Sequence, residues 1–235
     1  GSRMGWERAN FFAPPGREPV IEYSWGKQNW LDWSAAEQVN TRQAVTVFDQ
    51  TSFSKYLLAG PDAEAALQWL CTADVAVPVG KSVYTGMLNE RGTYESDVTV
   101  TRIGAREYLI VSSAATTERD KDHIRKNMPP GARTELVDAS SSMAAFGVMG
   151  PNSRELLSAL TDADLSDAAF PFGTSRLISL GYATVRATRI TYVGELGWEL
   201  YVPTEFAVGV YEQLMATGEQ FGIGTRGSYY EGSGA

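Results

Sequence analysis

Two stretches of the chain repeat one pattern of apolar and polar residues: a short apolar strand, a glycine–proline junction and a helix. Residues 55–60 read KYLLAG and lead through Pro61 into apolar residues at helical spacing. Residues 145–150 read AFGVMG and lead through Pro151 into a second such segment. The two glycines are ninety residues apart. This pattern predicts an internal pseudo-duplication of a small α+β unit.

Strand-like runs outnumber helical ones in the rest of the chain. Two hairpins are predicted, one joined through Gly104 and Ala105 and the other through Gly181. Residues 198–203, WELYVP, then alternate as a strand with one buried face, and residues 205–222 have the spacing of an amphipathic helix. We therefore predict an α+β fold with largely antiparallel sheets.

The two ends of the chain lack this periodicity. Residues 1–4, GSRM, are expected to be a cloning remnant, and residues 224–235, with four glycines, a flexible tail. The domain between them is expected to span 5–223, with two subdomains at about 5–140 and 141–223.

The composition favours a globular protein with a small ligand. With 235 residues, 43% of them apolar, the chain can bury a substantial core. A formal net charge of -8 argues against nucleic acid and anionic membranes as partners. No apolar run approaches the ~20 residues needed to cross a bilayer, and no signal peptide is recognisable.

Cys71 and His123 are the single cysteine and the single histidine. One cysteine excludes an internal disulfide and fits a reducing compartment, so we predict a cytoplasmic protein. One histidine excludes histidine triads and multi-histidine metal sites. No metal site is predicted, and carboxylates are the candidate catalytic groups.

An acidic pair interrupts a strand-like stretch, RGTYESDVTV, at residues 91–100. Strand alternation places Glu95 and Asp97 on one side and Val98 on the other, where the valine faces the core. Asp97 therefore points either to solvent or into a cavity on the opposite face of the sheet. The strand pattern alone is typical of an ordinary polar outer face.

A second acidic site is Glu195, which lies between Gly194 and Gly197 in YVGELGWE. Flanking glycines allow close approach of a ligand, and they equally serve a tight turn. A carboxylate at such a turn can accept two parallel hydrogen bonds from an amidine-like heterocycle edge, such as that of a pterin or a guanine.

Five motifs in one order resemble the folate-binding aminomethyltransferase family. That family comprises the glycine cleavage system aminomethyltransferase and the folate domains of dimethylglycine and sarcosine dehydrogenases or oxidases, and the opening motif and the ESD form look closer to the latter branch. The motifs are GWERANFF (5–12), VFDQTSFSKYLLAGPDA (47–63), YTGMLNERGTYESDVTVTR (84–102), GVMGPNSRELL (147–157) and TYVGELGWELYVP (191–203).

The resemblance implies a cloverleaf-like fold around a central channel for tetrahydrofolate, to which a one-carbon unit passes from an amine. It implies that Asp97 lies beside the reactive pterin nitrogens as a general base or electrostatic group, and that Glu195 holds the amino-pyrimidine edge. Core packing explains Met87 and Leu88 as well as channel lining does. The further residues expected to bind the cofactor are Tyr84, Met87, Leu88, Asn89, Glu95 and Tyr192.

The chain departs from the family pattern at two places. Thr93 stands where the dehydrogenase branch usually repeats glycine, a strained choice if that position needs a positive φ. After QFGI, at 220–223, an arginine-bearing helix and the C-terminal barrel have no counterpart. We expect a partner chain or domain to supply the missing part. No Gly-x-Gly-x-x-Gly motif follows a strand, so no flavin domain is predicted.

The leading hypothesis for function is tetrahydrofolate-dependent transfer of an aminomethyl or methyl group from a small amine such as a methylated glycine. The first alternative is a folate-dependent demethylase that acts on another methyl donor. The second is a folate-binding module without catalysis, and the third is an interaction scaffold. Neither the motifs nor the composition discriminates the first two hypotheses.

Overall fold

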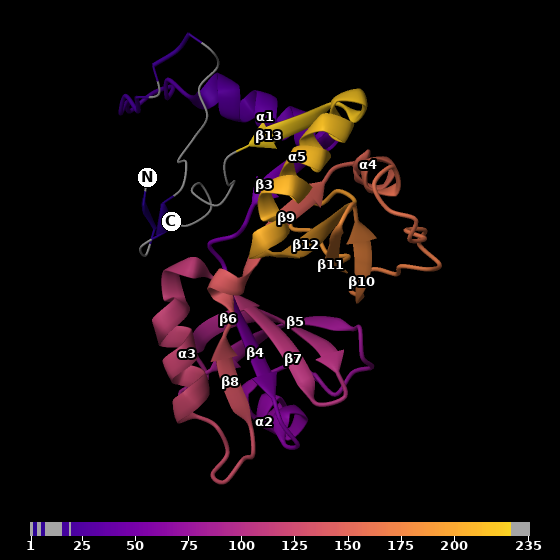
Figure 1. The fold of residues 1–235 in the computed structure, drawn as a ribbon. Coiled ribbons are helices and arrows are strands. Elements are labelled where there is room, and N and C mark those ends of the chain that lie inside the picture. The colour runs from indigo at the N-terminus through magenta and orange to yellow at the C-terminus, as the bar shows by residue number, and fades with distance from the viewer. Residues whose placement is uncertain (1, 4–5, 8–15, 19, 227–235) are drawn as a thin grey trace.

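Two sheets form two lobes, one above the other, in the computed structural model (Figure 1). The structure describes residues 2–3, 6–7, 16–18 and 20–226. The upper sheet consists, in spatial order, of β10 (Ser175–Leu180), β11 (Ala183–Thr188), β12 (Gly197–Pro203), β9 (Met143–Met149), β3 (Val45–Asp49) and β13 (Ile223–Arg226). The lower sheet consists of β5 (Ser82–Leu88), β6 (Tyr94–Gly104), β7 (Glu107–Ser112), β4 (Ser54–Ala59) and β8 (Glu135–Asp138).

Helices cover one face of each sheet. The α-helices are α1 (Leu31–Gln43), α2 (Ala63–Leu70), α3 (Thr117–Lys126), α4 (Ser153–Ser158) and α5 (Ala207–Gly218). Short 3-10 helices are η1 (Ala114–Thr116), η2 (Ser140–Ser142), η3 (Thr204–Phe206) and η4 (Glu219–Phe221), and β1 (Ser2–Arg3) pairs with β2 (Trp6–Glu7). In the two large sheets, only β13 and β3 pair in parallel.

The prediction of an α+β fold with largely antiparallel sheets is therefore confirmed. Both expected hairpins form, β6 with β7 and β10 with β11. The predicted helix after Pro61 is α2, whose apolar residues at helical spacing, Ala63, Ala66, Leu67 and Leu70, are all buried. The described residues contain no closed barrel.

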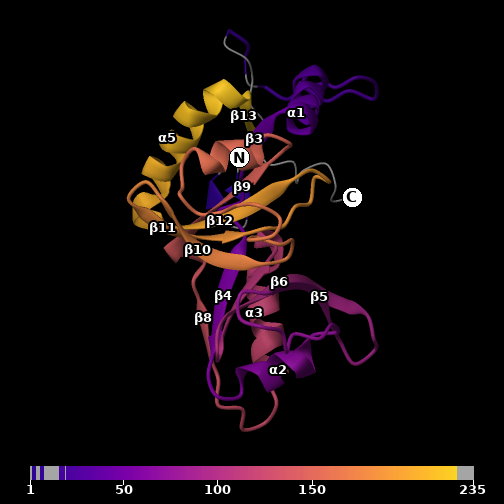
Figure 2. The same ribbon diagram turned by 90° about the vertical axis from the view of Figure 1, so that its right-hand side faces the viewer.

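Each sheet has its own core on the helix-covered face. In the upper lobe Trp198 and Val148 pack with α4 and α5, and Figure 2 shows α5 along the outer side of this sheet. In the lower lobe Tyr56 and Ile110 pack with α2 and α3. The opposite faces, called the inner faces below, meet at a small apolar cluster that includes Leu109, Val111, Ala145 and Tyr201.

The pseudo-duplication is visible in the backbone. Gly60 follows β4 with φ +139°, and Gly150 follows β9 with φ +134°. A Cβ at Gly60 would lie 2.2 Å from the carbonyl oxygen of Arg133, and a Cβ at Gly150 would lie 2.3 Å from that of Ala44. Arg133 lies just before β8, the strand that pairs with β4. Ala44 lies just before β3, the strand that pairs with β9. The two junctions are therefore the same structure built twice.

The two units contact each other symmetrically. Lys81 before β5 forms a bridge with Thr174 before β10. Beside it the backbone N–H of Ser82 donates to the carbonyl of Gly173 at 2.9 Å, and the N–H of Ser175 donates to the carbonyl of Gly80 at 2.6 Å. Below, the first unit means the lower sheet with α2 and α3, and the second unit means the upper sheet with α4 and α5.

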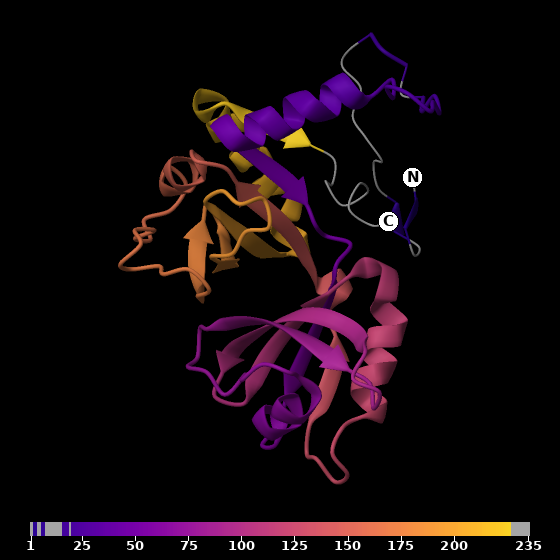
Figure 3. The same ribbon diagram turned by 180° about the vertical axis from the view of Figure 1, so that it is seen from behind.

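The chain crosses from the upper lobe to the lower one between β3 and β4, as the view from behind in Figure 3 shows. Lys55 stabilises this crossing. Its side chain is fully buried, and its Nζ donates to the carbonyls of Thr51 at 2.8 Å and Phe53 at 2.9 Å. Burial lowers the pKa of Lys55 to about 8, against the opposing charges of Asp49 and Asp138.

The ends of the domain differ in detail from the expectation. Residues 224–226, predicted to begin a tail, belong to β13 and pair with β3. The rest of the predicted tail, the expected cloning remnant apart from β1, and most of the GWERANFF motif lie outside the described residues. Although α1 and β3 precede the first unit in the chain, they lie with the upper sheet (Figure 3). The two-subdomain division stays a prediction.

Candidate functional site

Asp97 lies on the inner face of the lower sheet, where it contacts Tyr84. The two residues come from neighbouring strands, and the Tyr84 hydroxyl donates to Asp97 Oδ2 at 2.7 Å. Both side chains are exposed, Tyr84 by 71%. Val98 faces the core, as the alternation predicted. The structure thus brings two expected site residues together on an accessible surface, with a neutral donor holding one carboxylate oxygen.

Three other expected residues, Asn89, Glu95 and Met87, lie in or beside the hairpin between β5 and β6. The Asn89 side chain donates to Glu95 at 2.8 Å and to the Thr93 hydroxyl at 2.7 Å. Gly92 takes the positive φ of this turn, +75°. Met87 is fully buried in the helix-facing core, on the other side of the strand from Asp97. Of the two interpretations that the sequence left open for Met87, this position favours core packing, and a role in lining a channel stays a prediction.

Leu88, the last residue of β5, is half-buried. Its Cα partner is Tyr94, across an irregularity in the register that falls between Met87 and Leu88. Asp97 pairs with Gly86, which precedes the irregularity, whereas Leu88 follows it. A role for Leu88 in ligand binding stays a prediction.

Glu195 lies in the loop between β11 and β12, in an ion pair with Arg42. Arg42 Nε lies 3.0 Å from Glu195 Oε1, and its Nη1 donates to the carbonyl of Val193 at 3.2 Å. Gly194 has a φ of +78°, so the turn expected from the flanking glycines forms. The Glu195 side chain remains 22% exposed. Arg42, at the C-terminal end of α1, thus holds the Glu195 carboxylate, although α1 lies far from the YVGELGWE motif in the sequence.

Tyr192 folds the same loop over the inner face of the upper sheet. Its ring meets that of Phe48 edge to face, with centroids 5.5 Å apart. Phe48 alternates with Val47, which belongs to the helix-facing core, and so points to the inner face. Tyr192 and Glu195 therefore belong to the upper lobe, whereas Tyr84 and Asp97 belong to the lower one.

The inner face of the upper sheet also carries polar residues that the sequence analysis missed. Glu199 and Tyr201 alternate with Trp198 and Leu200 of the core, and the Tyr201 hydroxyl donates to Glu199 Oε2 at 2.5 Å. Burial raises the pKa of the Glu199 carboxyl, and the hydrogen bond from Tyr201 opposes this shift. The available signal was the alternation in WELYVP, which placed Glu199 opposite the buried face.

Gln50 completes this polar surface. The residue follows β3, and its backbone N–H donates to the carbonyl of Ala145 at 2.9 Å. Its side chain is 3% exposed and lies over Gly147, where a Cβ would come within 3.0 Å of Gln50 Oε1. No local pattern marks Gln50, because its burial arises from segments that are far apart in the chain.

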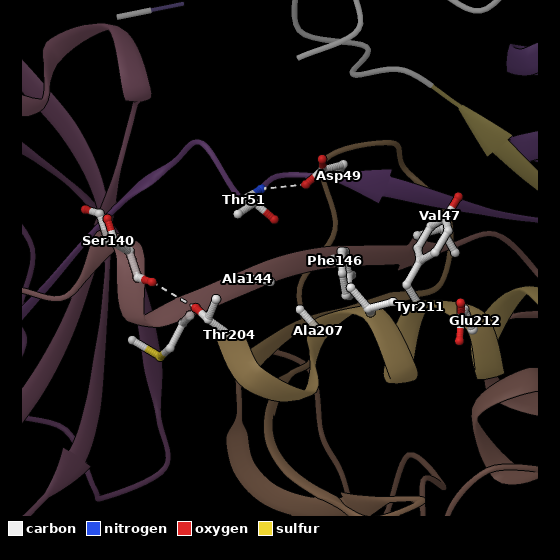
Figure 4. Close-up of a pocket in the computed structure, with 13 residues that line it drawn as sticks. Val47, Asp49, Thr51, Ser140, Ala144, Phe146, Thr204, Ala207, Tyr211 and Glu212 are labelled. Atoms are coloured by element: carbon white, nitrogen blue, oxygen red, sulfur yellow. Dashed lines mark hydrogen bonds between the residues drawn. The ribbon is translucent and has the colours of Figure 1, made fainter. Parts of the chain in front are cut away.

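A pocket of about 630 Å³ opens elsewhere, between η2, the end of β3, β9 and α5 (Figure 4). Phe146 and Tyr211 line it, with ring centroids 5.9 Å apart. Burial and the charge of Asp49 raise the pKa of Tyr211. None of the expected site residues lines this pocket. It borders the helix-facing core, and its lining residue Met143 also packs against the apolar cluster between the inner faces.

Neither a metal site nor a membrane-spanning helix is found among the described residues. No group of three or more histidine, cysteine, aspartate or glutamate side chains in this part of the chain could hold a metal ion. Among the helices in the described ranges, none is both long enough and apolar enough to span a membrane.

Comparison with known proteins gives consistent matches over nearly the whole chain. Residues 1–230 match the GCVT N-terminal domain family. The chain is 38% identical over 223 residues to "4-methylaminobutanoate oxidase (formaldehyde-forming)" of Paenarthrobacter nicotinovorans, covering 95% of the chain and 27% of that protein. It is 35% identical over 259 residues to "Sarcosine dehydrogenase, mitochondrial" of Homo sapiens, covering 94% of the chain and 28% of that protein. The chain thus spans about a quarter of the length of these relatives.

A solved structure shows the same fold. Glycine cleavage system aminomethyltransferase T from Bartonella henselae superposes with a TM-score of 0.73 at 22% identity, over 96% of this chain and 54% of that one. The expected aminomethyltransferase architecture is therefore confirmed.

Proposed function

The chain belongs to the GCVT N-terminal domain family, and from that premise we propose that it binds tetrahydrofolate and passes to it a one-carbon unit from a small amine such as a methylated glycine. Membership of this family of aminomethyltransferase-type domains supports folate-dependent one-carbon transfer in general. The donor, the residues that act and the cofactor contacts are the proposal.

The observation that carries the proposal is the contact between Asp97 and Tyr84. A carboxylate on an accessible strand face, held at one oxygen by a tyrosine hydroxyl 2.7 Å away, keeps lone pairs for a second partner. Such a group can take a proton from a nitrogen that forms a new bond to carbon. Tyr84 would act as the positioning residue, because its hydrogen bond fixes the direction in which Asp97 points.

The residues of the upper lobe fit the other end of a pterin. Glu195 keeps one oxygen outside the ion pair with Arg42 and remains accessible, so it can accept hydrogen bonds from an amino-pyrimidine edge. Tyr192 and Phe48 form an aromatic edge beside it. When bound, tetrahydrofolate would supply the nucleophilic nitrogens that accept the one-carbon unit.

The names of the two relatives suggest the donor class. One oxidises 4-methylaminobutanoate and the other sarcosine, and we propose an N-methylated amine for this chain too. Because the chain spans about a quarter of those proteins, oxidation of such an amine would fall to another domain or chain. A cytoplasmic location stays a prediction that rests on the cysteine content.

The test is an anaerobic calorimetric titration of tetrahydrofolate into the wild-type chain and two variants. Glu195→Gln should weaken binding by about 2 kcal/mol, because it removes a charge-assisted contact. Asp97→Asn should bind within a few-fold of wild-type and lose transfer activity. Asp122→Asn, on the exposed surface of α3, is the matched control and should change neither.

The outcomes separate the alternatives. Binding without transfer from any amine would favour the non-catalytic folate module, and transfer only from other methyl donors would favour the demethylase. If the folded wild-type chain binds no tetrahydrofolate, the proposal is wrong.

A further inference from the structure

The pocket between β9 and α5 has aromatic walls and carries negative charge. Figure 4 shows its main residues, Asp49 from β3, Phe146 from β9 and Tyr211 from α5. Its volume of about 630 Å³ lies within the ~300–1,000 Å³ typical of small-molecule sites. The described lining includes the carboxylates of Asp49 and Glu212 and no lysine, arginine or histidine. The pocket is therefore large enough for a small molecule and has no positive charge of its own.

The equivalent place in the first unit can be identified, because the two units align throughout. The helices α3 and α5 begin ninety residues apart, as the glycines of the two junctions are. On the same spacing Tyr56 of β4 corresponds to Phe146 of β9. The strand registers place Asp138 opposite Tyr56 and Asp49 opposite Phe146, so the two aspartates are counterparts as well.

In the first unit an ammonium group occupies this place. Lys121 of α3, the counterpart of Tyr211, lies with its Nζ 3.4 Å from Asp138 Oδ2 and 2.6 Å from Glu118 Oε1. The Lys121 side chain is only 15% exposed, so its aliphatic stem is packed against the first unit. The fold thus shows which group this aspartate position holds: an ammonium on an apolar stem.

The second unit lacks this ammonium group. Tyr211 replaces Lys121, and Val208, which is 70% exposed, replaces Glu118. The first change exchanges a cation for an aromatic ring, and the second exchanges a carboxylate for an aliphatic side chain. Both new residues line the pocket together with Asp49. The pocket therefore opens where the first unit holds a lysine stem.

Asp49 keeps one carboxylate oxygen for a ligand. Its Oδ1 accepts the backbone N–H of Thr51 at 3.0 Å, and neither Asp49 nor Glu212 forms an ion pair in the described part of the chain. The positive charge of Lys55 acts on both Asp49 and Asp138, so it does not distinguish the two units. What distinguishes them is the missing ammonium partner of Asp49 Oδ2.

We propose that this pocket binds an organic cation with an apolar body, a primary alkyl- or arylalkylammonium without a carboxylate. Its ammonium group pairs with Asp49, as Lys121 pairs with Asp138 in the first unit. The body packs against the rings of Phe146 and Tyr211, whose centroids are 5.9 Å apart, and a cation near a ring face is stabilised further. None of the residues expected to bind tetrahydrofolate lines the pocket, so the inference goes beyond the proposed function.

The test compares two cations with a neutral analogue. Phenethylammonium, butylammonium and phenethyl alcohol are titrated into the wild-type chain without tetrahydrofolate, and binding is followed by amide chemical shifts. Butylammonium reproduces the lysine side chain from Cβ to Nζ. Wild-type should bind phenethylammonium more tightly than butylammonium, because the larger body contacts both rings, and more tightly than phenethyl alcohol, which has no charge. The shifted amides should fall in 47–51, 143–146 and 204–212.

Two substitutions test the assigned contacts. Asp49→Asn keeps the acceptor for Thr51 and should weaken phenethylammonium about tenfold, the effect of one charge-assisted contact. It should leave phenethyl alcohol unchanged, whereas a distorted pocket would weaken both. Tyr211→Lys rebuilds the arrangement of the first unit and should abolish binding of both cations, because its own ammonium group reaches Asp49. The matched control is Glu205→Gln, which removes an exposed charge in η3 outside the lining and should bind like wild-type.

The results test this inference separately from the proposed function. The cation site is disproved if folded wild-type binds phenethylammonium no more tightly than phenethyl alcohol, if Asp49→Asn binds it like wild-type, or if the shifted amides lie elsewhere. A loss of affinity for phenethyl alcohol in Asp49→Asn would also count against it. Asp49→Asn and Tyr211→Lys should bind tetrahydrofolate like wild-type, and weaker binding by both would overturn the separation of the two sites.

Discussion

The two units of the molecule share their polar framework and differ on their inner faces. Asp49 and Thr51 in the second unit correspond to Asp138 and Ser140 in the first, and in each pair a backbone N–H donates to the aspartate Oδ1 at 3.0 Å. The hydroxyls of Ser82 and Thr101 contact each other at 2.8 Å, and those of their counterparts Ser175 and Thr188 at 2.9 Å.

This difference separates two kinds of polar residue. Polar residues present in both units form hydrogen bonds with the backbone or with each other, and these bonds stabilise the fold. Those present in one unit, such as the Tyr84–Asp97 pair, correspond to Leu177 and Thr184 in the other, so the framework does not require them. Polar residues that occur once are therefore the candidates for ligand binding, except where they bond to the backbone, as Lys55 does.

The largest expected effect tests whether the two junctions are equivalent. Gly60→Ala and Gly150→Ala should each destabilise the protein by at least about 3 kcal/mol, because a Cβ would clash with backbone at 2.2–2.3 Å. Urea unfolding measures both losses. Gly209→Ala in α5, where no atom lies within 4 Å, is the control and should not destabilise. A loss below about 1 kcal/mol at one junction would break the equivalence.

A second prediction compares the buried aromatic residues at corresponding positions, Trp198 opposite Val148 and Tyr108 opposite Leu58. Trp198→Phe should lower the free energy of unfolding by about 2 kcal/mol, because it leaves a cavity in the core. Tyr108→Phe removes only a hydroxyl that contacts Glu64 at 3.3 Å, so its loss should stay below about 1 kcal/mol. Equal losses in urea unfolding would contradict the account.

The third prediction concerns pH and the buried Lys55, whose counterpart in the second unit is Ala145. The folded protein releases the Lys55 proton near its lowered pKa of about 8, and the unfolded chain near 10.5. The folded state binds fewer protons between these values, so stability should rise with pH there, by something on the order of 2 kcal/mol. Urea unfolding at pH 8 and pH 10 should show this rise in wild-type and not in Lys55→Met; the same slope in both would refute it.

The smallest effect concerns Glu199, which corresponds to Leu109. Burial raises the pKa of Glu199 above its usual 4.5, so the folded state binds more protons than the unfolded state at higher pH, and stability falls as pH rises through this window. Glu199→Gln keeps an acceptor for Tyr201 and removes the charge. It should gain about 1 kcal/mol at pH 7 and nothing at pH 4. Thermal unfolding at both values checks this, and a gain at pH 4 would contradict it.

Much of the fold could be predicted because its signals are local. The alternation in the hairpins and the spacing in α2 depend on neighbouring residues only, and the repeated glycine–proline junction marked both units. β13 was missed because residues 224–226 carry no apolar alternation, and their pairing with β3 is a contact between distant segments.

The candidate site was predictable only where its residues fall in contiguous motifs. Asp97, Tyr84 and Glu195 belong to such motifs, but the partner Arg42 comes from α1, about 150 residues away. The sequence left Met87 between channel lining and core packing, because alternation cannot tell which face of a strand meets a ligand, and the structure places it in the core. Gln50 gave no signal, since its burial is a property of three-dimensional packing.

The most direct test of the central claim is to map tetrahydrofolate binding by amide chemical shifts. The account predicts that the shifted amides cluster around 84–97 in the lower lobe and 192–201 in the upper one, on residues that occur in one unit only. Shifts confined to the pocket between β9 and α5, or to the residues common to both units, would contradict it.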